Sequence, residues 1–133
     1  MDVVDALQGR DIPAILGPLD VYYPEPATVS PGKPVPVLFF IYGGGFVNGD
    51  RKMAPPFDLA YTNVGVFFAK RGILTVIPDY RLFPHATYPG PVEDVRDALA
   101  WVLSNAPAIA SSPASTLPAS TALSSLFVLS QSA

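Results

Sequence analysis

The longest apolar stretch of the 133-residue chain runs from Val35 to Tyr42 and is apolar nearly throughout. Continuous apolarity predicts a strand that is buried on both faces, as in a parallel sheet covered by helices. Ile73 to Ile77, which ends at Pro78, and Leu126 to Leu129 predict two further strands of this kind. Leu19 to Tyr23 alternates loosely and is rich in strand formers, so it predicts a fourth strand.

Two stretches carry apolar residues at helical spacing. The first lies between Phe57 and Arg71 and is followed by Gly72, a typical stop signal. The second runs from Val92 to Ala106. Pro107 to Ser125, rich in Ala, Ser, Pro and Thr, predicts a flexible surface loop. The predicted apolar positions of the two helices are Ala60, Val64, Phe67 and Phe68, then Val92, Val95, Leu99, Val102 and Leu103, with Trp101 expected in the core.

The order strand, helix, strand, helix, strand predicts an α/β fold with a right-handed parallel sheet. In such sheets, binding sites lie at the carboxyl ends of the strands. Two unusual segments fall at predicted strand ends, Gly43–Gly45 and Ser130–Ala133. We therefore expect the two segments to meet at one end of the sheet.

The composition restricts the classes of function. Half of the residues are hydrophobic and 14% are charged, which favours a buried core over disorder. The net charge of −3 and the lack of a basic patch argue against nucleic-acid binding. The chain has no cysteine and one histidine, His85, which excludes thiolate and multi-histidine metal sites. No apolar signal segment precedes the first strand, and no apolar run approaches the roughly 20 residues that span a bilayer, so we expect a cytoplasmic protein.

The segment Ser130-Gln131-Ser132-Ala133 follows a predicted strand and has the small-x-Ser-x pattern of a nucleophile elbow. A serine nucleophile needs a base, and its tetrahedral intermediate needs N–H donors for the oxyanion. Consecutive glycines such as Gly43–Gly45 let backbone N–H groups approach a substrate closely. The glycines alone could equally form a simple turn, and Ser132 alone could be an ordinary serine. A phosphate loop is disfavoured because no Gly-Lys-Ser/Thr follows.

Several motifs together resemble one known superfamily. Tyr42-Gly43-Gly44-Gly45-Phe46 after an apolar strand looks like the His-Gly-Gly-Gly oxyanion segment of α/β-hydrolase esterases and lipases. The resemblance is to the hormone-sensitive-lipase-like, feruloyl-esterase-like and kynurenine-formamidase-like branches. It covers about Leu19 to Ala133, so residues 1–18 form an N-terminal segment and 19–133 a partial α/β-hydrolase domain that stops at the elbow. The further motifs that carry it are Asp79-Tyr80-Arg81-Leu82, Tyr88-Pro89, Glu93-Asp94 and Trp101.

The resemblance implies a serine hydrolase of carboxylic esters, with Ser132 as the nucleophile. It implies that the amides of Gly44, Gly45 and Ala133 form the oxyanion hole. It implies a small-molecule ester substrate and no cofactor, and it leaves the oligomeric state open. An amide or formamide hydrolase is the alternative within the same fold.

The sequence departs from the family pattern in four places. Tyr42 stands where the family usually has histidine, and Ser130 replaces the first elbow glycine. The second elbow glycine would be residue 134, and the acid and histidine of the family follow the serine. The 133 residues therefore predict a hydrolase piece without its base, for which the alternative is a catalytically inactive fragment. Leu126 to Leu129 would then lie at an exposed apolar edge, which is an aggregation hazard.

Other chemistry-bearing residues are expected to be structural. His85 precedes the serine, where the family has no catalytic histidine, so we expect a solvated loop residue. The resemblance gives the remaining charged candidates roles in ion pairs and caps: Asp79, Arg81, Glu93 and Asp94.

Overall fold

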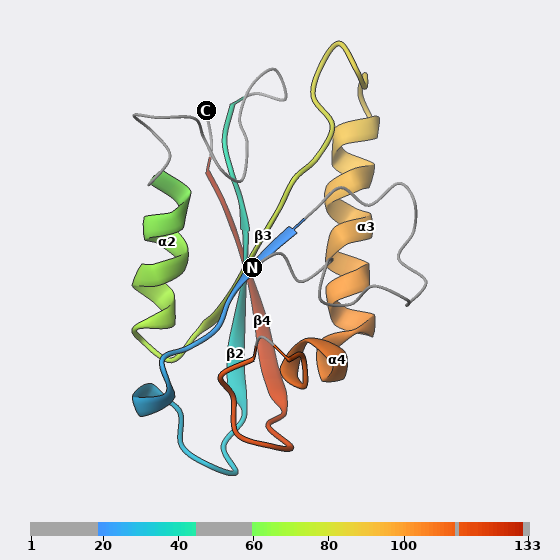
Figure 1. The fold of residues 1–133 in the computed structure, drawn as a ribbon. Coiled ribbons are helices and arrows are strands. Elements are labelled where there is room, and N and C mark those ends of the chain that lie inside the picture. The colour runs from blue at the N-terminus through green and yellow to red at the C-terminus, as the bar shows by residue number, and fades with distance from the viewer. Residues whose placement is uncertain (1–18, 45–59, 114, 132–133) are drawn as a thin grey trace.

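The computed structural model describes residues 19–44, 60–113 and 115–131. Strands and helices alternate after the first strand (Figure 1). In chain order the elements are β1 (Leu19–Tyr22), the 3-10 helix η1 (Pro26–Thr28), β2 (Val35–Ile41), α2 (Ala60–Ala69), β3 (Leu74–Pro78), α3 (Gly90–Ser104), α4 (Ala106–Ala110) and β4 (Leu123–Ser130).

The four strands form one sheet in the order β1-β3-β2-β4. β2 is parallel to both of its neighbours, which confirms the three parallel strands that the apolar runs predicted. β1, whose direction the sequence did not predict, is antiparallel to β3, so the four-stranded sheet as a whole is mixed. Parallel strands need a long crossover, usually a helix, whereas β1 and β2 are joined only by a proline-rich connection with η1.

Helices cover both faces of the sheet (Figure 1). α2 lies on one face, and α3 and α4 lie on the other. The core on the α3 side includes Phe39, Leu74 and Val76 from the strands, with Trp101 and Ile109 from the helices. Trp101 is buried, as the sequence predicted. The smaller core on the α2 side is built around Phe40, Tyr42, Ile77 and Tyr80.

The segment between α3 and β4 is more regular than a flexible loop. It contains α4, whose Ile109 is fully buried and whose first turn contains Pro107. Alanine favours helix, and proline is tolerated in a first helical turn, so this composition suits a short helix as well as a loop. β4 also begins earlier than predicted, at Leu123.

The predicted apolar faces of α2 and α3 are confirmed in part, since Val95, Leu99 and Val102 of α3 pack in or against the core. On α2, Gly65 packs so closely on the Tyr22 ring that no Cβ would fit, while Phe67 is 49% exposed. On α3, Val92 and Leu103 are exposed. The buried side of α3 also includes residues that the apolar spacing did not select: Pro91, Asp94 and Ala98.

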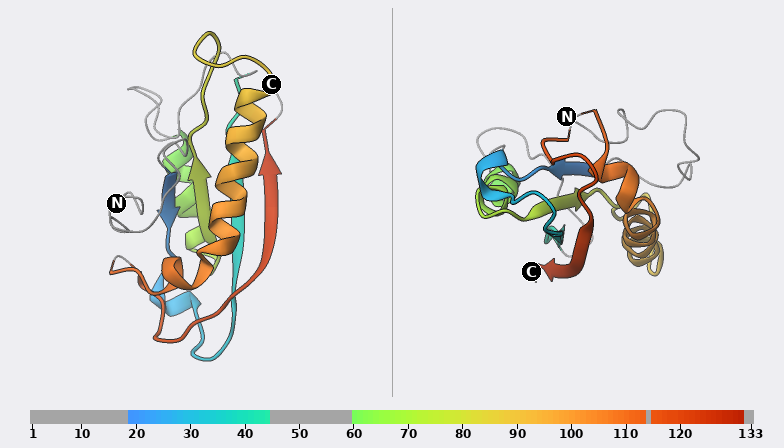
Figure 2. Two further views of the ribbon diagram at one scale, coloured as in Figure 1. Left: turned by 90° about the vertical axis from the view of Figure 1, so that its right-hand side faces the viewer. Right: turned by 90° about the horizontal axis from the view of Figure 1, so that it is seen from below.

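β4 is an outer strand of the sheet (Figure 2), and most of its residues are exposed to solvent. Phe127, Val128 and Leu129 are exposed by 59%, 51% and 45%. α2 packs on β3 and β1, so it does not cover this strand. The predicted apolar edge is therefore confirmed. In the part of the chain that the structure describes, no helix is long and apolar enough to cross a membrane.

We expect Phe127→Lys to slow the self-association of the chain severalfold, because a lysine on an edge strand opposes edge-to-edge pairing. Phe83→Lys is the matched control, since Phe83 is exposed by a similar 58% but lies in a loop. Light scattering against protein concentration measures the effect. Equal rates of self-association for the two variants would show that the β4 edge does not govern association.

Candidate functional site

The carboxyl ends of β2 and β4 meet at one end of the sheet. The parallel ladder pairs Ile41 with Ser130. It continues one residue further, because the backbone N–H of Gln131 donates to the carbonyl oxygen of Ile41 at 3.1 Å. The pairing therefore holds the chain up to the residue that precedes Ser132.

Gly43 lies directly against this end of β4. A side chain at Gly43 would place its Cβ 3.3 Å from the carbonyl oxygen of Gln131, which is tighter than almost all real contacts. Gly44 has a φ of 133°, a backbone conformation that other residues rarely adopt. The two glycines thus meet two separate demands, close approach at Gly43 and an unusual φ at Gly44.

Of the predicted site residues, Gly44 lies within the described part of the chain. Gly45, Ser132 and Ala133 lie outside the described residues. The structure therefore brings together the neighbours of the predicted groups, Gly43 and Gln131, at the expected end of the sheet.

The residue that replaces the family's histidine, Tyr42, is 2% exposed and has partners that the sequence did not identify. Its hydroxyl donates to Asp79 Oδ1 at 3.0 Å and lies 3.5 Å from the donor N–H of Tyr80. The Tyr80 hydroxyl donates to the carbonyl oxygen of Tyr42 at 2.7 Å. The available sequence signal was the position of Asp79-Tyr80 directly after β3, whose carboxyl end adjoins that of β2.

Burial keeps both phenols neutral over the ordinary pH range. It raises the pKa of Tyr42 strongly, and the negative charge of Asp79 adds to the rise. Burial also raises the pKa of Tyr80 to about 12. Both hydroxyls therefore remain hydrogen-bond donors at neutral pH.

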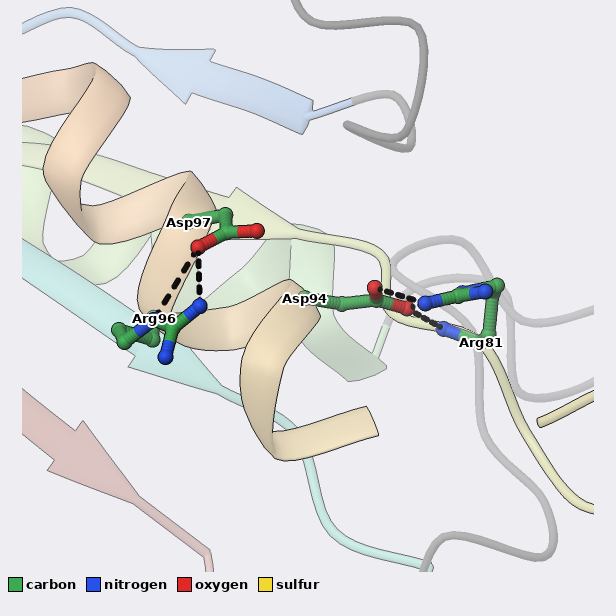
Figure 3. A network of polar contacts seen from close by, with 4 residues as sticks. All are labelled: Arg81, Asp94, Arg96 and Asp97. Atoms are coloured by element: carbon green, nitrogen blue, oxygen red, sulfur yellow. Dashed lines mark hydrogen bonds and ion pairs between the residues drawn. The ribbon is translucent and has the colours of Figure 1, made fainter. Parts of the chain in front are cut away.

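A second polar cluster anchors the loop between β3 and α3 (Figure 3). Asp94, 5% exposed, accepts from Arg81 Nε at 2.8 Å, from Nη2 at 2.7 Å and from the backbone N–H at 3.0 Å. The hydrogen bond from Arg81 lowers the pKa of the Asp94 carboxyl. The expected ion-pair role of Arg81 and Asp94 is thus confirmed. The nearby pair of Arg96 and Asp97 is exposed, so it contributes little.

An apolar hollow of about 420 Å³ adjoins Gln131 on the α2 side of the sheet. The Tyr61 hydroxyl lies at its wall, 3.4 Å from Gln131 Oε1. A larger hollow of about 840 Å³ lies far from this site, at the opposite end of β4, between residues 106 and 123. The hollow beside Gln131 is lined by Phe40, Tyr61, Val64, Leu129, Ser130 and Gln131.

The described residues hold no metal-binding cluster, and the histidine of the chain lies in a loop. No group of three or more His, Cys, Asp or Glu side chains among them could bind a metal ion. His85 is exposed in the loop before α3, as expected for a solvated residue.

Comparisons with known proteins identify relatives of this arrangement. The sequence model of the BD-FAE family matches residues 19–116, which is more than half of the chain. Probable carboxylesterase 7 of Arabidopsis thaliana is 34% identical over 87 residues, which cover 65% of this chain and 26% of that protein. The non-reducing polyketide synthase ascC of Acremonium egyptiacum is 38% identical over 106 residues, which cover 79% of this chain and 4% of the synthase.

Solved structures of similar fold include an esterase from Rhizomucor miehei and a bacterial heroin esterase. Each superposes with a TM-score of 0.57 at 28% identity, over 86% of this chain and 30% of the other. The chain thus spans less than a third of the length of these structures and a still smaller share of the curated relatives.

We expect Gly44→Ala to lower the free energy of unfolding by about 2–3 kcal/mol, because alanine would be strained at its φ. Gly32→Ala is the control, since Gly32 also has a positive φ, 78°, with open space around it. It should cost only about 1 kcal/mol. Urea unfolding measures both, and a neutral Gly44→Ala variant would contradict the strained conformation.

We expect Asp94→Asn to lower the Tm at neutral pH, with Asp97→Asn as a nearly silent control. The folded-state pKa of Asp94 is lowered from its ordinary 3.8, so its stabilisation is full above that value and is lost as pH falls through the folded pKa. Thermal unfolding from about pH 7 down to about pH 3 should show that the difference in Tm between the wild type and Asp94→Asn becomes smaller in acid. A Tm difference that stays constant over this range would show that the charge of Asp94 does not cause the stabilisation.

Proposed function

The chain belongs to the BD-FAE family of α/β-hydrolase esterases, and from this membership we propose that it carries the nucleophile and oxyanion loop of a serine hydrolase of carboxylic esters. Ser132 is the proposed nucleophile. The backbone N–H groups of Gly44, Gly45 and Ala133 are the proposed oxyanion donors.

One observation supports the proposal above the others: β2 and β4 pair up to Gln131, with Gly43 packed against that residue. Gln131 directly precedes Ser132 in the sequence, so this contact supports a nucleophile at the same end of the sheet as the glycines. A serine beside preorganised N–H groups is the arrangement that acyl transfer requires.

In the proposed reaction, Ser132 Oγ attacks the acyl carbon of the ester and transfers its proton to a base. The carbonyl electron pair moves onto the oxygen, where the three N–H groups hold the negative charge. The intermediate collapses and expels the alcohol, which takes the proton from the base. Water then releases the acid from the acyl-serine by the same steps.

The base is proposed to come from polypeptide outside residues 1–133. His85 is the only histidine in the sequence, and it lies exposed in the loop before α3. The solved esterases extend well beyond the part that this chain matches. A histidine and its carboxylate supplied by such polypeptide would complete the triad.

Two observations bear on the substrate. The hollow beside Gln131 is mainly apolar, which favours an uncharged acyl group. The match to fungal non-reducing polyketide synthases favours a polyketide acyl group as a second candidate.

An amide or formamide hydrolase remains the alternative reaction of the same site. A catalytically inactive fragment is the alternative for the 133 residues alone, and the open β4 edge favours it.

The test combines a fluorophosphonate probe with imidazole as a diffusible base. Attack by Ser132 Oγ on phosphorus expels fluoride and passes the serine proton to imidazole, and peptide mass spectrometry identifies the labelled serine. We expect Ser132 to react faster than Ser130 by roughly tenfold or more, because a single oxyanion donor is worth about 10²–10³ in rate. Ser124→Ala, near the other end of β4, should leave this labelling unchanged.

The same samples are then assayed with a short-chain ester, an aromatic polyketide ester and a formamide. Turnover that needs both Ser132 and imidazole would support the hydrolase and rank the three substrate classes. Turnover without imidazole that His85→Ala abolishes would overturn the proposed external base. Labelling spread evenly over the serines, together with no Ser132-dependent turnover, would overturn the nucleophile and favour the inactive fragment.

A further inference from the structure

The rings of two tyrosines stack on each other at the point where β2 ends and the glycines begin. Tyr42 follows β2 directly, and Tyr80 follows β3 by two residues. Their rings stack with centroids 4.6 Å apart and planes 19° apart, and Tyr61 packs against Tyr42 at 5.6 Å. Both Tyr42 and Tyr80 are buried. The pair therefore fills the gap between two parallel strand ends with rigid, well-packed rings.

The polar contacts of this pair are reciprocal. The Tyr80 hydroxyl donates to the main-chain carbonyl of Tyr42 at 2.7 Å. The Tyr42 hydroxyl lies 3.5 Å from the main-chain N–H of Tyr80 and donates to Asp79 at 3.0 Å. Each ring thus contacts the backbone of the other residue. Such a closed pair restrains both strand ends more than either hydrogen bond would alone.

The hydrogen bond to the Tyr42 carbonyl also restrains the backbone of the glycine that follows. The Tyr42 carbonyl and the Gly43 N–H belong to one planar peptide unit, so a hydrogen bond that fixes the carbonyl also fixes the direction of that N–H. Gly44, with its φ of 133°, comes next in the chain. Without this hydrogen bond the backbone of the glycines would be free to adopt many conformations, because glycine has the least restricted φ and ψ of any residue.

We propose that Tyr42 and Tyr80 form a positioning brace that orients the Gly43–Gly44 backbone for oxyanion binding. The proposal rests on the proposed function, because it assigns the brace to the oxyanion loop. Tyr80 acts on the loop through the Tyr42 carbonyl, and Tyr42 transmits the restraint along the main chain. Both are positioning residues, and neither takes part in the chemical steps.

The test uses Tyr80→Phe, which keeps the ring stack and removes the hydroxyl that holds the Tyr42 carbonyl. Tyr23→Phe is the matched control, because the Tyr23 hydroxyl donates to the carbonyl of Ile109 at 2.6 Å in a different part of the core. Nitrogen-15 relaxation reports the order parameters of the Gly43 and Gly44 amides. Fluorophosphonate labelling with imidazole reports the rate at Ser132.

We expect Tyr80→Phe to lower the glycine order parameters from about 0.85 to about 0.6 or below. We expect it to slow labelling of Ser132 by roughly tenfold or more, as for the loss of one oxyanion donor. Tyr23→Phe should lower the free energy of unfolding by about as much as Tyr80→Phe does, and it should leave the glycine order parameters and the labelling rate at the wild-type level. Tyr42→Phe, which keeps the bonded carbonyl, should have a smaller effect than Tyr80→Phe.

Equal glycine order in Tyr80→Phe and Tyr23→Phe would overturn the brace. Mobile glycines with an unchanged rate at Ser132 would overturn its role in oxyanion binding. Failure of the proposed function is separate: Ser132 would then be labelled no faster than Ser130 in the wild type. A variant that does not fold is replaced by Tyr42→Phe, for which reduced glycine order supports the brace and wild-type order contradicts it.

Discussion

The parallel pairing of β2 with β4 is the interaction on which the candidate site depends. The two strands are far apart in the sequence, yet the ladder runs from Val35 and Leu123 to Ile41 and Ser130. A pairing shifted by one residue would turn every side chain of β4 to the other face. It would also move Gln131 away from Gly43, because the contact between them exists only in this register. Fold and site are therefore determined by the same set of hydrogen bonds.

The sheet can hold this register because its interior is well buried on the β1–β3–β2 side. Leu19, Phe39, Leu74 and Val76 have no exposed surface, and helices cover both faces there. Toward β4 the burial ends, since α2 packs on β3 and β1 instead. An interface that looks like a core cut in half is typical of a permanent partner or of a larger domain. The relation to esterases of more than three times the matched length agrees with the second case.

The sequence was sufficient for the features that depend on local composition. Continuous apolar runs identified β2, β3 and β4, and the glycines marked the strand end at which the candidate site lies. The antiparallel direction of β1 was not predicted, because the composition of the strand itself suits either direction. The roles of Tyr80 and Asp79 were also missed, since hydrogen bonds between strands follow from the sheet order. Gly45, Ser132 and Ala133 remain predictions of the sequence.

The strand that carries the proposed nucleophile is also the least protected strand of the sheet. β4, like β1, has a hydrogen-bonded neighbour on one side only, but most of its residues are exposed, and elements with few buried contacts open most easily. Catalysis by a serine needs its position held to a fraction of an ångström, because small displacements cost large factors in rate. The exposed apolar residues of β4 adjoin the hollow beside Gln131, because Leu129 belongs to both. Polypeptide that brings the base would thus also cover the exposed strand, so that one docking event would both complete the triad and steady the nucleophile.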